Sequence, residues 1–242
     1  MALVVGLGRM GTFHAAVLAD LGHDVTTVDP DPGKGADYAT VGQAARARVY
    51  DVACVAVPIP MLGRTAASVA MAIQPEYLLV EKPFPCSTEE AATWLPVLLG
   101  RDMRVGVGYV ERFNPSVLAL KGPLAHAGGA VSATFTRHND RPSHDVDVDL
   151  RSHDIDLARY LGVPIEACTF DTRAPMDRKQ RTLTVQSMAG VEYTADLMAH
   201  GGNPLRDMWE AFLEGSPDVA TVEDAMHVVR TLEHSTRMQE AA

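Results

Sequence analysis

Several features that mark specialised classes of protein are scarce in this sequence. Its three cysteines, Cys54, Cys86 and Cys168, are far apart and form no C-x-x-C pair, so we expect reduced thiols and no disulfide framework. Basic residues number 21 against 31 acidic ones, and the net charge of −10 argues against a nucleic acid or an anionic membrane as partner. The sequence has no apolar run of membrane-spanning length and no signal-peptide pattern at its start. We therefore expect a cytoplasmic protein.

The remaining composition is that of an ordinary globular protein. The chain has 242 residues, of which 47% are hydrophobic, and this is enough to bury a core. We find no internal repeat and no low-complexity tract. The length accommodates one large domain or two small ones.

The most specific pattern lies at the start of the chain, from Met1 to Asp29. An apolar run at 3–5 leads into a G-x-G-x-x-G turn formed by Gly6, Gly8 and Gly11, and apolar residues at helical spacing follow over 12–21. Gly6 permits a tight turn, Gly8 lets a pyrophosphate approach the backbone, and Gly11 allows close packing of helix on strand. The helix N-terminus then offers N–H groups to the phosphates. A glycine turn with a purely structural role is the alternative.

An acidic residue marks the end of the next β-rich run, 25–28. Asp29 follows the glycine turn at close to the spacing at which a carboxylate bonds the ribose 2′-OH of NAD. A 2′-phosphate would be repelled there, so the sequence favours NAD over NADP. The candidate cofactor-binding residues are Gly6, Gly8, Arg9, Met10, Gly11, Asp29, Val57, Pro58, Glu81 and Lys82.

Strand-like and helical segments alternate from Met1 to Gly108, which predicts a doubly wound parallel sheet of the Rossmann type. The later strands are expected at 51–57, 77–80 and 104–109, with helices at 41–49, 62–73 and 88–99. Beyond them the pattern changes to α+β, with strands at 131–138, 181–188 and 191–198 and helices at 149–161, 207–213 and 222–238. Ala189-Gly190 suggests a hairpin, so this sheet should be mainly antiparallel. We expect a dinucleotide-binding domain at 1–108 and a smaller α+β domain at 109–242.

Four motifs in one order resemble those of the glucose–fructose oxidoreductase / inositol dehydrogenase (Gfo/Idh/MocA) family. They are the glycine turn, Glu81-Lys82-Pro83 after a buried strand, the run 108–115 beginning Gly108-Tyr109, and the run 149–157 containing Asp149 and His153. The sequence looks most similar to the UDP-N-acetylglucosamine 3-dehydrogenase branch. The resemblance implies an NAD(P)-dependent oxidoreductase that acts on a secondary hydroxyl, or the matching ketone, of a sugar, cyclitol or nucleotide sugar.

The resemblance also implies the catalytic residues. Lys82 would reach the substrate hydroxyl and the nicotinamide ribose, the peptide between Lys82 and Pro83 is often cis, and His153 beside Asp149 would be the acid/base. The chemistry fits, because a histidine can take the alcohol proton near neutral pH and a lysine can stabilise a developing alkoxide. Spacing of i, i+4 would place Asp149 and His153 on one helix face. Without the family context, His153 beside Asp154 and Asp156 reads as a solvated helix residue and Lys82 as a surface lysine.

Basic residues gather near these motifs and suggest a substrate phosphate. Arg137 and Arg141 precede the Asp149 segment, and Arg112 lies in the 108–115 run; arginine can grip phosphate bidentately. The alternative is that they neutralise Asp140, Asp145, Asp147 and Asp149. The candidate substrate-binding residues are Tyr109, Arg112, Arg137 and Arg141. The nicotinamide chemistry needs no metal, and none is expected. His14 reads as an ordinary surface or satisfied histidine, and Trp209 as core.

The region between 168 and 181 lacks strands that the family usually has. The second domain is therefore expected to be shortened, and the resemblance implies that its sheet could form a homodimer. Two other functions stay open. One is an imine or ketone reductase of a specialised biosynthetic pathway, and the other is a non-catalytic NAD(P)-binding regulatory protein.

Overall fold

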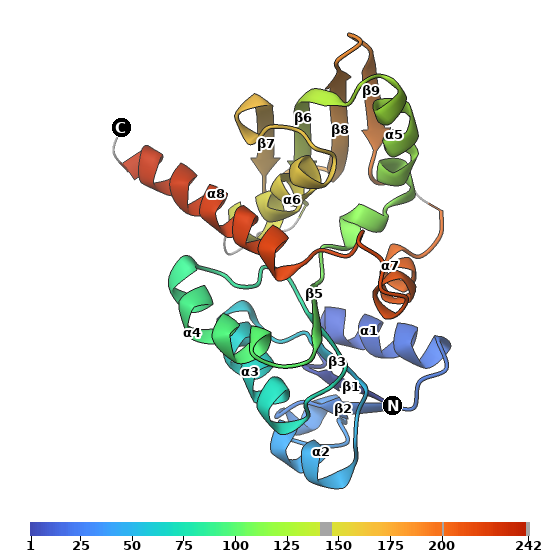
Figure 1. The fold of residues 1–242 in the computed structure, drawn as a ribbon, viewed down its shortest axis with the longest axis vertical. Coiled ribbons are helices and arrows are strands. Elements are labelled where there is room, and N and C mark those ends of the chain that lie inside the picture. The colour runs from blue at the N-terminus through green and yellow to red at the C-terminus, as the bar shows by residue number, and fades with distance from the viewer. Residues whose placement is uncertain (141–146, 200, 241–242) are drawn as a thin grey trace. The chain divides into compact units, whose positions relative to one another are not determined.

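The computed structural model describes residues 1–140, 147–199 and 201–240 (Figure 1). The chain divides into two compact units. The first comprises Met1–Gly108 and Leu205–Val229, and the second comprises Tyr109–Pro204 and the chain from Arg230 onward. No helix of the described residues has the length and apolar character that crossing a membrane requires.

The first unit is built on a five-stranded parallel sheet. Its strands are β1 (Ala2–Val5), β2 (Val25–Val28), β3 (Val52–Val55), β4 (Tyr77–Val80) and β5 (Arg104–Val107), in the order β2-β1-β3-β4-β5. Strands β1 and β3 are buried along their whole length, as expected for a parallel sheet that is covered on both faces. The chain direction across the sheet reverses at β1, so the turn after β1 lies at the topological switch point where α/β sheets bind ligands.

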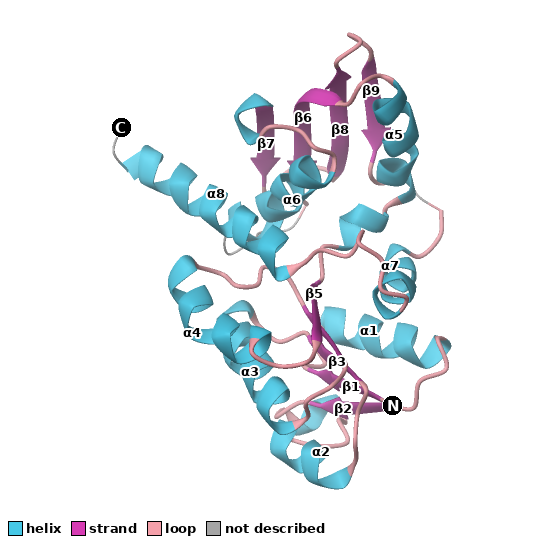
Figure 2. Ribbon diagram, in the orientation of Figure 1, coloured by secondary structure: helices cyan, strands magenta, loops and turns pink. Residues whose placement is uncertain are grey.

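Helices cover both faces of this sheet. Helices α2 (Val41–Ala47), α3 (Leu62–Ala72) and α4 (Thr88–Leu99) follow one another on one face, and α1 (Arg9–Asp20) lies on the other (Figure 2). Short 3₁₀ turns, η1 (Pro32–Lys34) and η2 (Ile59–Met61), precede α2 and α3. The Ser87 hydroxyl accepts a hydrogen bond from the Glu90 N–H and caps α4.

Part of the C-terminal chain completes the first unit. The aromatic side chains Trp209 and Phe212 of α7 (Pro204–Leu213) are buried, and the Phe212 ring contacts Tyr77 of β4 edge to face at 5.6 Å. The Val107 N–H of β5 donates to the Ala220 carbonyl at 2.9 Å. Helix α8 (Val222–Glu240) follows. The second domain was expected to comprise 109–242, whereas Leu205–Val229 belongs to the first unit. The reason is that the buried aromatic side chains of α7 pack in the first unit.

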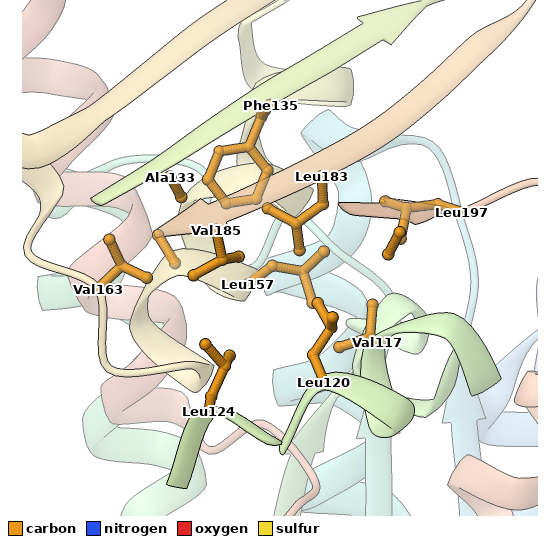
Figure 3. Packing of buried hydrophobic residues seen from close by; sticks show 12 residues of the cluster. Val117, Leu120, Leu124, Ala133, Phe135, Leu157, Val163, Leu183, Val185 and Leu197 are labelled. Carbon is orange, nitrogen blue, oxygen red and sulfur yellow. The ribbon is translucent and has the colours of Figure 1, made fainter. Parts of the chain in front are cut away.

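The second unit contains a four-stranded sheet with helices on one face. Its strands are β6 (Ala130–His138), β7 (Cys168–Arg173), β8 (Gln180–Ser187) and β9 (Glu192–Asp196), in the order β7-β6-β8-β9. The predicted hairpin of β8 and β9 is confirmed, with Gly190 at φ 77° in its turn. Helices α5 (Pro115–His126) and α6 (Ser152–Tyr160) pack against the sheet through a shared apolar core (Figure 3). Its labelled members are Val117, Leu120, Leu124, Ala133, Phe135, Leu157, Val163, Leu183, Val185 and Leu197.

The predicted fold class is confirmed, with three local corrections in the second unit. Strand β7 was not predicted, because its polar sequence C-T-F-D-T-R resembles a loop; it pairs parallel to β6 after the α6 crossover. Helix α5 was also missed, because Gly122 and Pro123 interrupt its helical pattern. The first part of the predicted 149–161 helix is a π-helical turn, η4 (Asp147–Arg151), from which α6 continues.

Candidate cofactor and catalytic sites

The glycine turn after β1 has the geometry of a phosphate-binding loop. Gly6 has φ +94°, and a Cβ on it would lie 2.5 Å from the Ala56 carbonyl oxygen. A Cβ on Gly11 would overlap the Gly6 oxygen, so both positions require glycine. A Cβ on Gly8 would meet no protein atom within 4 Å. Gly8 thus faces open space, through which a pyrophosphate could approach the main chain. Because glycine has no side chain, the N–H groups of the first turn of α1 also lack a side-chain cap.

Asp29 is held against this turn. Its Oδ2 accepts a hydrogen bond from the Leu7 N–H at 2.7 Å, and its Oδ1 accepts one from the Asp31 N–H at 2.9 Å. A carboxylate offers about four acceptor positions, so each oxygen can accept a further hydrogen bond. The end of β2 therefore presents a fixed carboxylate beside the turn, at a position suited to a ribose hydroxyl.

The other candidate cofactor residues surround the same edge of the sheet. Arg9 and Met10 open α1, with Arg9 exposed. Val57 and Pro58 follow β3, and the Val57 Cγ1 would lie 2.9 Å from a Cβ on Gly6. These residues and the turn fit a dinucleotide, because they supply backbone N–H donors, one acidic side chain and an apolar wall.

The Glu81-Lys82-Pro83 segment leaves β4 at the same edge. Glu81 is buried, and its Oε2 accepts the Lys82 N–H at 3.1 Å. The peptide between Lys82 and Pro83 is cis, as the family resemblance implied. Lys82 is partly exposed. The segment thus has one buried acidic residue and, directly after it, a lysine that solvent or a ligand can reach.

His14 connects this segment to α1, and of its two predicted readings, surface or satisfied, the structure confirms the satisfied one. Its ring is fully buried, its Nε2 lies 2.8 Å from Glu81 Oε1, and its Nδ1 accepts a hydrogen bond from Trp209 Nε1–H at 2.9 Å. His14 is therefore no surface residue. Its position shortly after Gly11 was visible in the sequence, but its partners lie 67 and 195 residues further along the chain.

Cys86 does not supply a nucleophile to this edge of the sheet. Burial and the neighbouring Glu90 raise the pKa of the Cys86 thiol to about 12. Its S–H donates a hydrogen bond to the Glu90 carboxylate, with Sγ and Oε2 2.6 Å apart. The thiol is thus protonated at neutral pH and poorly reactive.

In the second unit, Asp149 and His153 lie at the junction of η4 and α6. Asp149 belongs to the π-helical turn and His153 to the first turn of α6, so the i, i+4 argument for a regular α-helix does not apply to them directly. Single π turns occur frequently at functional sites. His153 is partly exposed, and its ring meets that of Tyr109 edge to face at 6.1 Å.

The two aspartates that follow His153 point into the protein rather than into solvent. Asp154 and Asp156 are buried, as are Ser152, Ile155 and Leu157. The reading of this segment as a solvated helix is therefore not supported. The two carboxylates are bound by two arginines, which fix the rotation of α6 and with it the direction of His153.

These arginines were predicted to bind substrate phosphate, and the structure corrects that prediction. Arg137 is 1% exposed and binds Asp154 Oδ1 at 2.8 Å and Glu111 Oε1 at 3.2 Å. Arg112 is 3% exposed and holds both oxygens of Asp156 at 2.9 and 2.6 Å. Both are engaged by carboxylates, as the alternative reading proposed, although the partners are not the aspartates named there. Arg141 lies outside the described residues.

A buried charge cluster therefore underlies α6. We use this name for Glu111, Arg137, Asp154 and Arg181. Burial alone would raise the pKa of Glu111, but Arg137 and Arg181 hold it below its usual value, and the Asn114 amide donates to it as well. Burial raises the pKa of Asp154 in spite of Arg137. The cluster shows that arginines concentrated in an acidic protein can have a structural role.

Among the described residues, no group of histidine, cysteine or acidic side chains has the arrangement of a metal site. Tyr109 is buried beside His153, and its role in substrate binding stays a prediction. The geometry supports dinucleotide binding in the first unit and a placed histidine in the second.

Comparison with known proteins adds the family context. No protein-family model matches the sequence. The chain is 26% identical over 165 residues to UDP-N-acetylglucosamine 3-dehydrogenase of Acidithiobacillus ferrooxidans; the match covers 65% of this chain and 53% of that relative. The chain thus matches about half the length of that curated relative.

Solved structures agree with the fold over almost the whole chain. The structure of UDP-N-acetylglucosamine 3-dehydrogenase from Acidithiobacillus ferrooxidans matches with a TM-score of 0.81 at 17% identity, covering 96% of this chain and 95% of that one. GenD2 from gentamicin A biosynthesis, solved in complex with NAD, matches with a TM-score of 0.79 at 22% identity, covering 96% and 91%. The protein has the fold of the Gfo/Idh/MocA-type dehydrogenases, so the family resemblance is confirmed at the level of fold.

Proposed function

We propose that this chain is an NAD-dependent oxidoreductase that interconverts a secondary hydroxyl and a ketone on a sugar, cyclitol or nucleotide sugar. The observation that carries the proposal is the glycine turn with Asp29 bound against it, beside a buried Glu81 and a reachable Lys82. The relatives support the same reaction class, since one is a UDP-N-acetylglucosamine 3-dehydrogenase and another was solved with NAD.

The residues around the turn would hold NAD as follows. The first turn of α1 and the open side of Gly8 would receive the pyrophosphate, and Asp29 would accept a hydrogen bond from the adenosine ribose. The fixed negative charge of Asp29 disfavours a 2′-phosphate. Bound NAD would supply the hydride-transfer chemistry of the reaction.

The chain itself supplies the proton transfer and the charge stabilisation. We propose that the imidazole of His153 takes the hydroxyl proton during oxidation and returns it during reduction. The neighbouring Asp149 carboxylate would favour the correct tautomer of that ring or bind a substrate hydroxyl. The ammonium group of Lys82 would stabilise the negative charge that develops on the substrate oxygen.

A turnover screen tests the proposal. The purified protein should reduce NAD with at least one compound from a panel of UDP-sugars, the matching free sugars and inositols, followed at the absorbance of NADH. Binding of NAD without turnover of any compound in the panel would favour the non-catalytic regulatory alternative. Reduction of imines or simple ketones, with no reaction on sugars, would favour the reductase alternative. This reductase alternative is supported by the structural similarity to GenD2, a protein of gentamicin A biosynthesis.

Two further proposals concern the setting of the enzyme. We propose a homodimer formed through the second sheet, because α5 and α6 pack on one face only while the opposite face carries exposed polar residues such as Thr134 and Thr194. A monomeric mass in light scattering at micromolar concentration would contradict it. We also propose a cytoplasmic location, which the three unpaired cysteines support. Fractionation of cells that express the native gene tests this.

A further inference from the structure

A chain of buried hydrogen bonds in the first unit ends at the residue before Lys82. It runs from Trp209 of α7 through the ring of His14 in α1 to the carboxylate of Glu81. Below, this set of three residues is called the His14 relay. The catalytic roles proposed above do not use any of its members.

The directions of the hydrogen bonds define the state of His14. An indole N–H can only donate, so His14 Nδ1 holds a lone pair and the ring proton lies on Nε2, from which it is donated to Glu81. Burial disfavours a charged imidazole, whereas Cys54 and Glu81 would raise its pKa to about 10 if both ring nitrogens could carry a proton. The indole N–H of Trp209 points at His14 Nδ1 from 2.9 Å. A second proton on Nδ1 would place two N–H groups against each other, so the imidazole is neutral.

Glu81 is fixed from several sides. Its Oε1 accepts a hydrogen bond from His14 Nε2–H, and its Oε2 accepts one from the Lys82 N–H at 3.1 Å. The Glu81 N–H donates to the Val55 carbonyl of β3 at 2.9 Å. Gly108 closes the remaining side, since a Cβ there would approach the Glu81 carboxyl group at 3.2 Å. The peptide that begins Lys82 is therefore held by a side chain that is itself held by His14.

We propose that His14, oriented by Trp209, is a positioning residue that fixes Lys82 through Glu81. Helix α1 starts at the glycine turn, and His14 lies one turn further along the same helix. One rigid helix thus carries both the phosphate-binding N-terminus and the support of Lys82, so the lysine is held at a constant distance from the pyrophosphate site. This inference rests on the proposed function for the role of Lys82, but the relay and its effect on Lys82 can be measured without turnover.

Variants of two residues separate positioning from packing. His14→Leu removes both hydrogen bonds, whereas His14→Gln retains an amide N–H for Glu81 and an amide oxygen for Trp209. Trp209→Phe removes the indole N–H and keeps an aromatic ring, so it tests the relay if His14→Leu does not fold. Trp94→Phe is the matched control, because the chain has only two tryptophans and Trp94 packs against Gly63 of α3, away from the relay.

The first readout is spectroscopic and needs no substrate. The sequence contains four lysines, Lys34, Lys82, Lys121 and Lys179, so reductive ¹³C-methylation should give four lysine dimethylamine signals beside that of the N-terminal amine. Lys82 is assigned by Lys82→Arg. We expect His14→Leu and Trp209→Phe to shift or broaden the Lys82 signal and His14→Gln to restore it. Trp94→Phe should leave it in place. A Lys82 signal that is the same in all variants would overturn the proposal.

The second readout is the division between kcat and binding. His14→Leu should lower kcat about tenfold or more, because small displacements of a catalytic group are costly. The Kd for NAD should change less than about threefold. His14→Gln should recover most of kcat. Equal losses in NAD affinity and kcat, or an unchanged kcat, would overturn the positioning role. If the wild type turns over no substrate, the proposed function fails, and the Lys82 signal still decides the relay.

Discussion

The two units hold their candidate functional groups by different means. In the first unit the glycine turn, Asp29 and Glu81 are fixed mainly by backbone hydrogen bonds and by a neutral histidine. In the second unit α6 is fixed by buried ion pairs, in which Arg137 binds Asp154 and Arg112 binds Asp156. In the first arrangement the buried Glu81 carboxylate is bound by a neutral ring N–H and a backbone N–H. The second pairs opposite charges in a buried site, is costly to form and fails severely if one partner is removed.

This difference determines what a mutation should disturb. Changes at the glycine turn should mainly affect ligand binding, because the open side of Gly8 contacts no protein atom. Changes in the buried charge cluster should mainly affect stability, and activity only through the placement of His153. The following predictions test this contrast in order of decreasing effect.

The largest effect is expected from Arg137→Met. It leaves Glu111 and Asp154 with an uncompensated negative charge in a buried site, which should lower the free energy of unfolding by about 3–5 kcal/mol. Urea unfolding at pH 7 measures this. The double variant Arg137→Met/Asp154→Leu should recover part of the loss, since it removes the stranded carboxylate. A loss below about 1 kcal/mol would mean that the ion pair does not fix α6.

The next effect concerns Lys82→Ala, in the first unit. Because the charge of Lys82 acts mainly in the transition state, kcat should fall about 100-fold, or about 2.7 kcal/mol, while the Kd for NAD and the unfolding midpoint change little. Steady-state kinetics and a fluorescence titration of NAD measure both quantities. Lys34→Ala is the control, since Lys34 is exposed on η1 in the same unit. An unchanged kcat would remove Lys82 from the mechanism.

The sequence was a reliable guide to the first unit because its signals are local. Glycine spacing, an acidic residue at a strand end and continuous apolar strands all report on neighbours that are close in the sequence. The strand Tyr77–Val80 and the helix Thr88–Leu99 were predicted with the bounds observed. For His14 the sequence could not decide between a surface and a satisfied histidine, because one of its partners is Trp209, 195 residues further along the chain.

The second unit was harder to predict because its determinants are distant in sequence. Arg137 contacts Glu111 and Asp154, at separations of 26 and 17 residues, so a local count of charges suggested a phosphate site where the fold makes ion pairs. Strand β7 is an edge strand whose polar residues need only one partner. Helix α5 forms despite Pro123 because Val117, Leu120 and Leu124 pack into the core.

A smaller effect is expected at Asp29. Asp29→Ser removes the charge that disfavours a 2′-phosphate and keeps a hydroxyl that can accept the Leu7 N–H. The ratio of NAD to NADP affinity should fall about tenfold, which corresponds to about 1.4 kcal/mol, with little change in stability. Asp31→Ser is the matched control, because Asp31 caps η1 two residues away. A wild type that already prefers NADP would show that Asp29 does not select the cofactor.

The smallest effect is a pH-dependent one and tests the buried charge cluster without breaking it. Arg181 is about one-third exposed and binds Glu111 Oε1 at 3.1 Å, so Arg181→Met removes one of the two cations that lower the pKa of Glu111. A carboxyl group whose pKa is lowered on folding stabilises the protein above its unfolded pKa, here near 4.5, and this stabilisation is lost as the pH falls through the folded pKa. Arg181 also lowers the pKa of Asp154, because its positive charge favours the charged carboxylate. Removing Arg181 therefore shifts the pKa of Asp154 and that of Glu111 in the same direction.

The difference in Tm between wild type and Arg181→Met should therefore be constant between about pH 7 and pH 5.5 and shrink below about pH 4.5. Lys179→Met is the control, because Lys179 pairs with Asp140 at 3.5 Å on the surface of the same unit, and exposed pairs contribute about 0–1 kcal/mol. Its Tm difference from wild type should be small throughout. A difference for Arg181→Met that stays constant down to pH 3.5 would mean that Arg181 stabilises by packing of its side chain. Arg137 and Asn114 would then be the groups that stabilise the charged form of Glu111. The pair of Arg137 with Asp154 would be the ion pair of the cluster that holds α6.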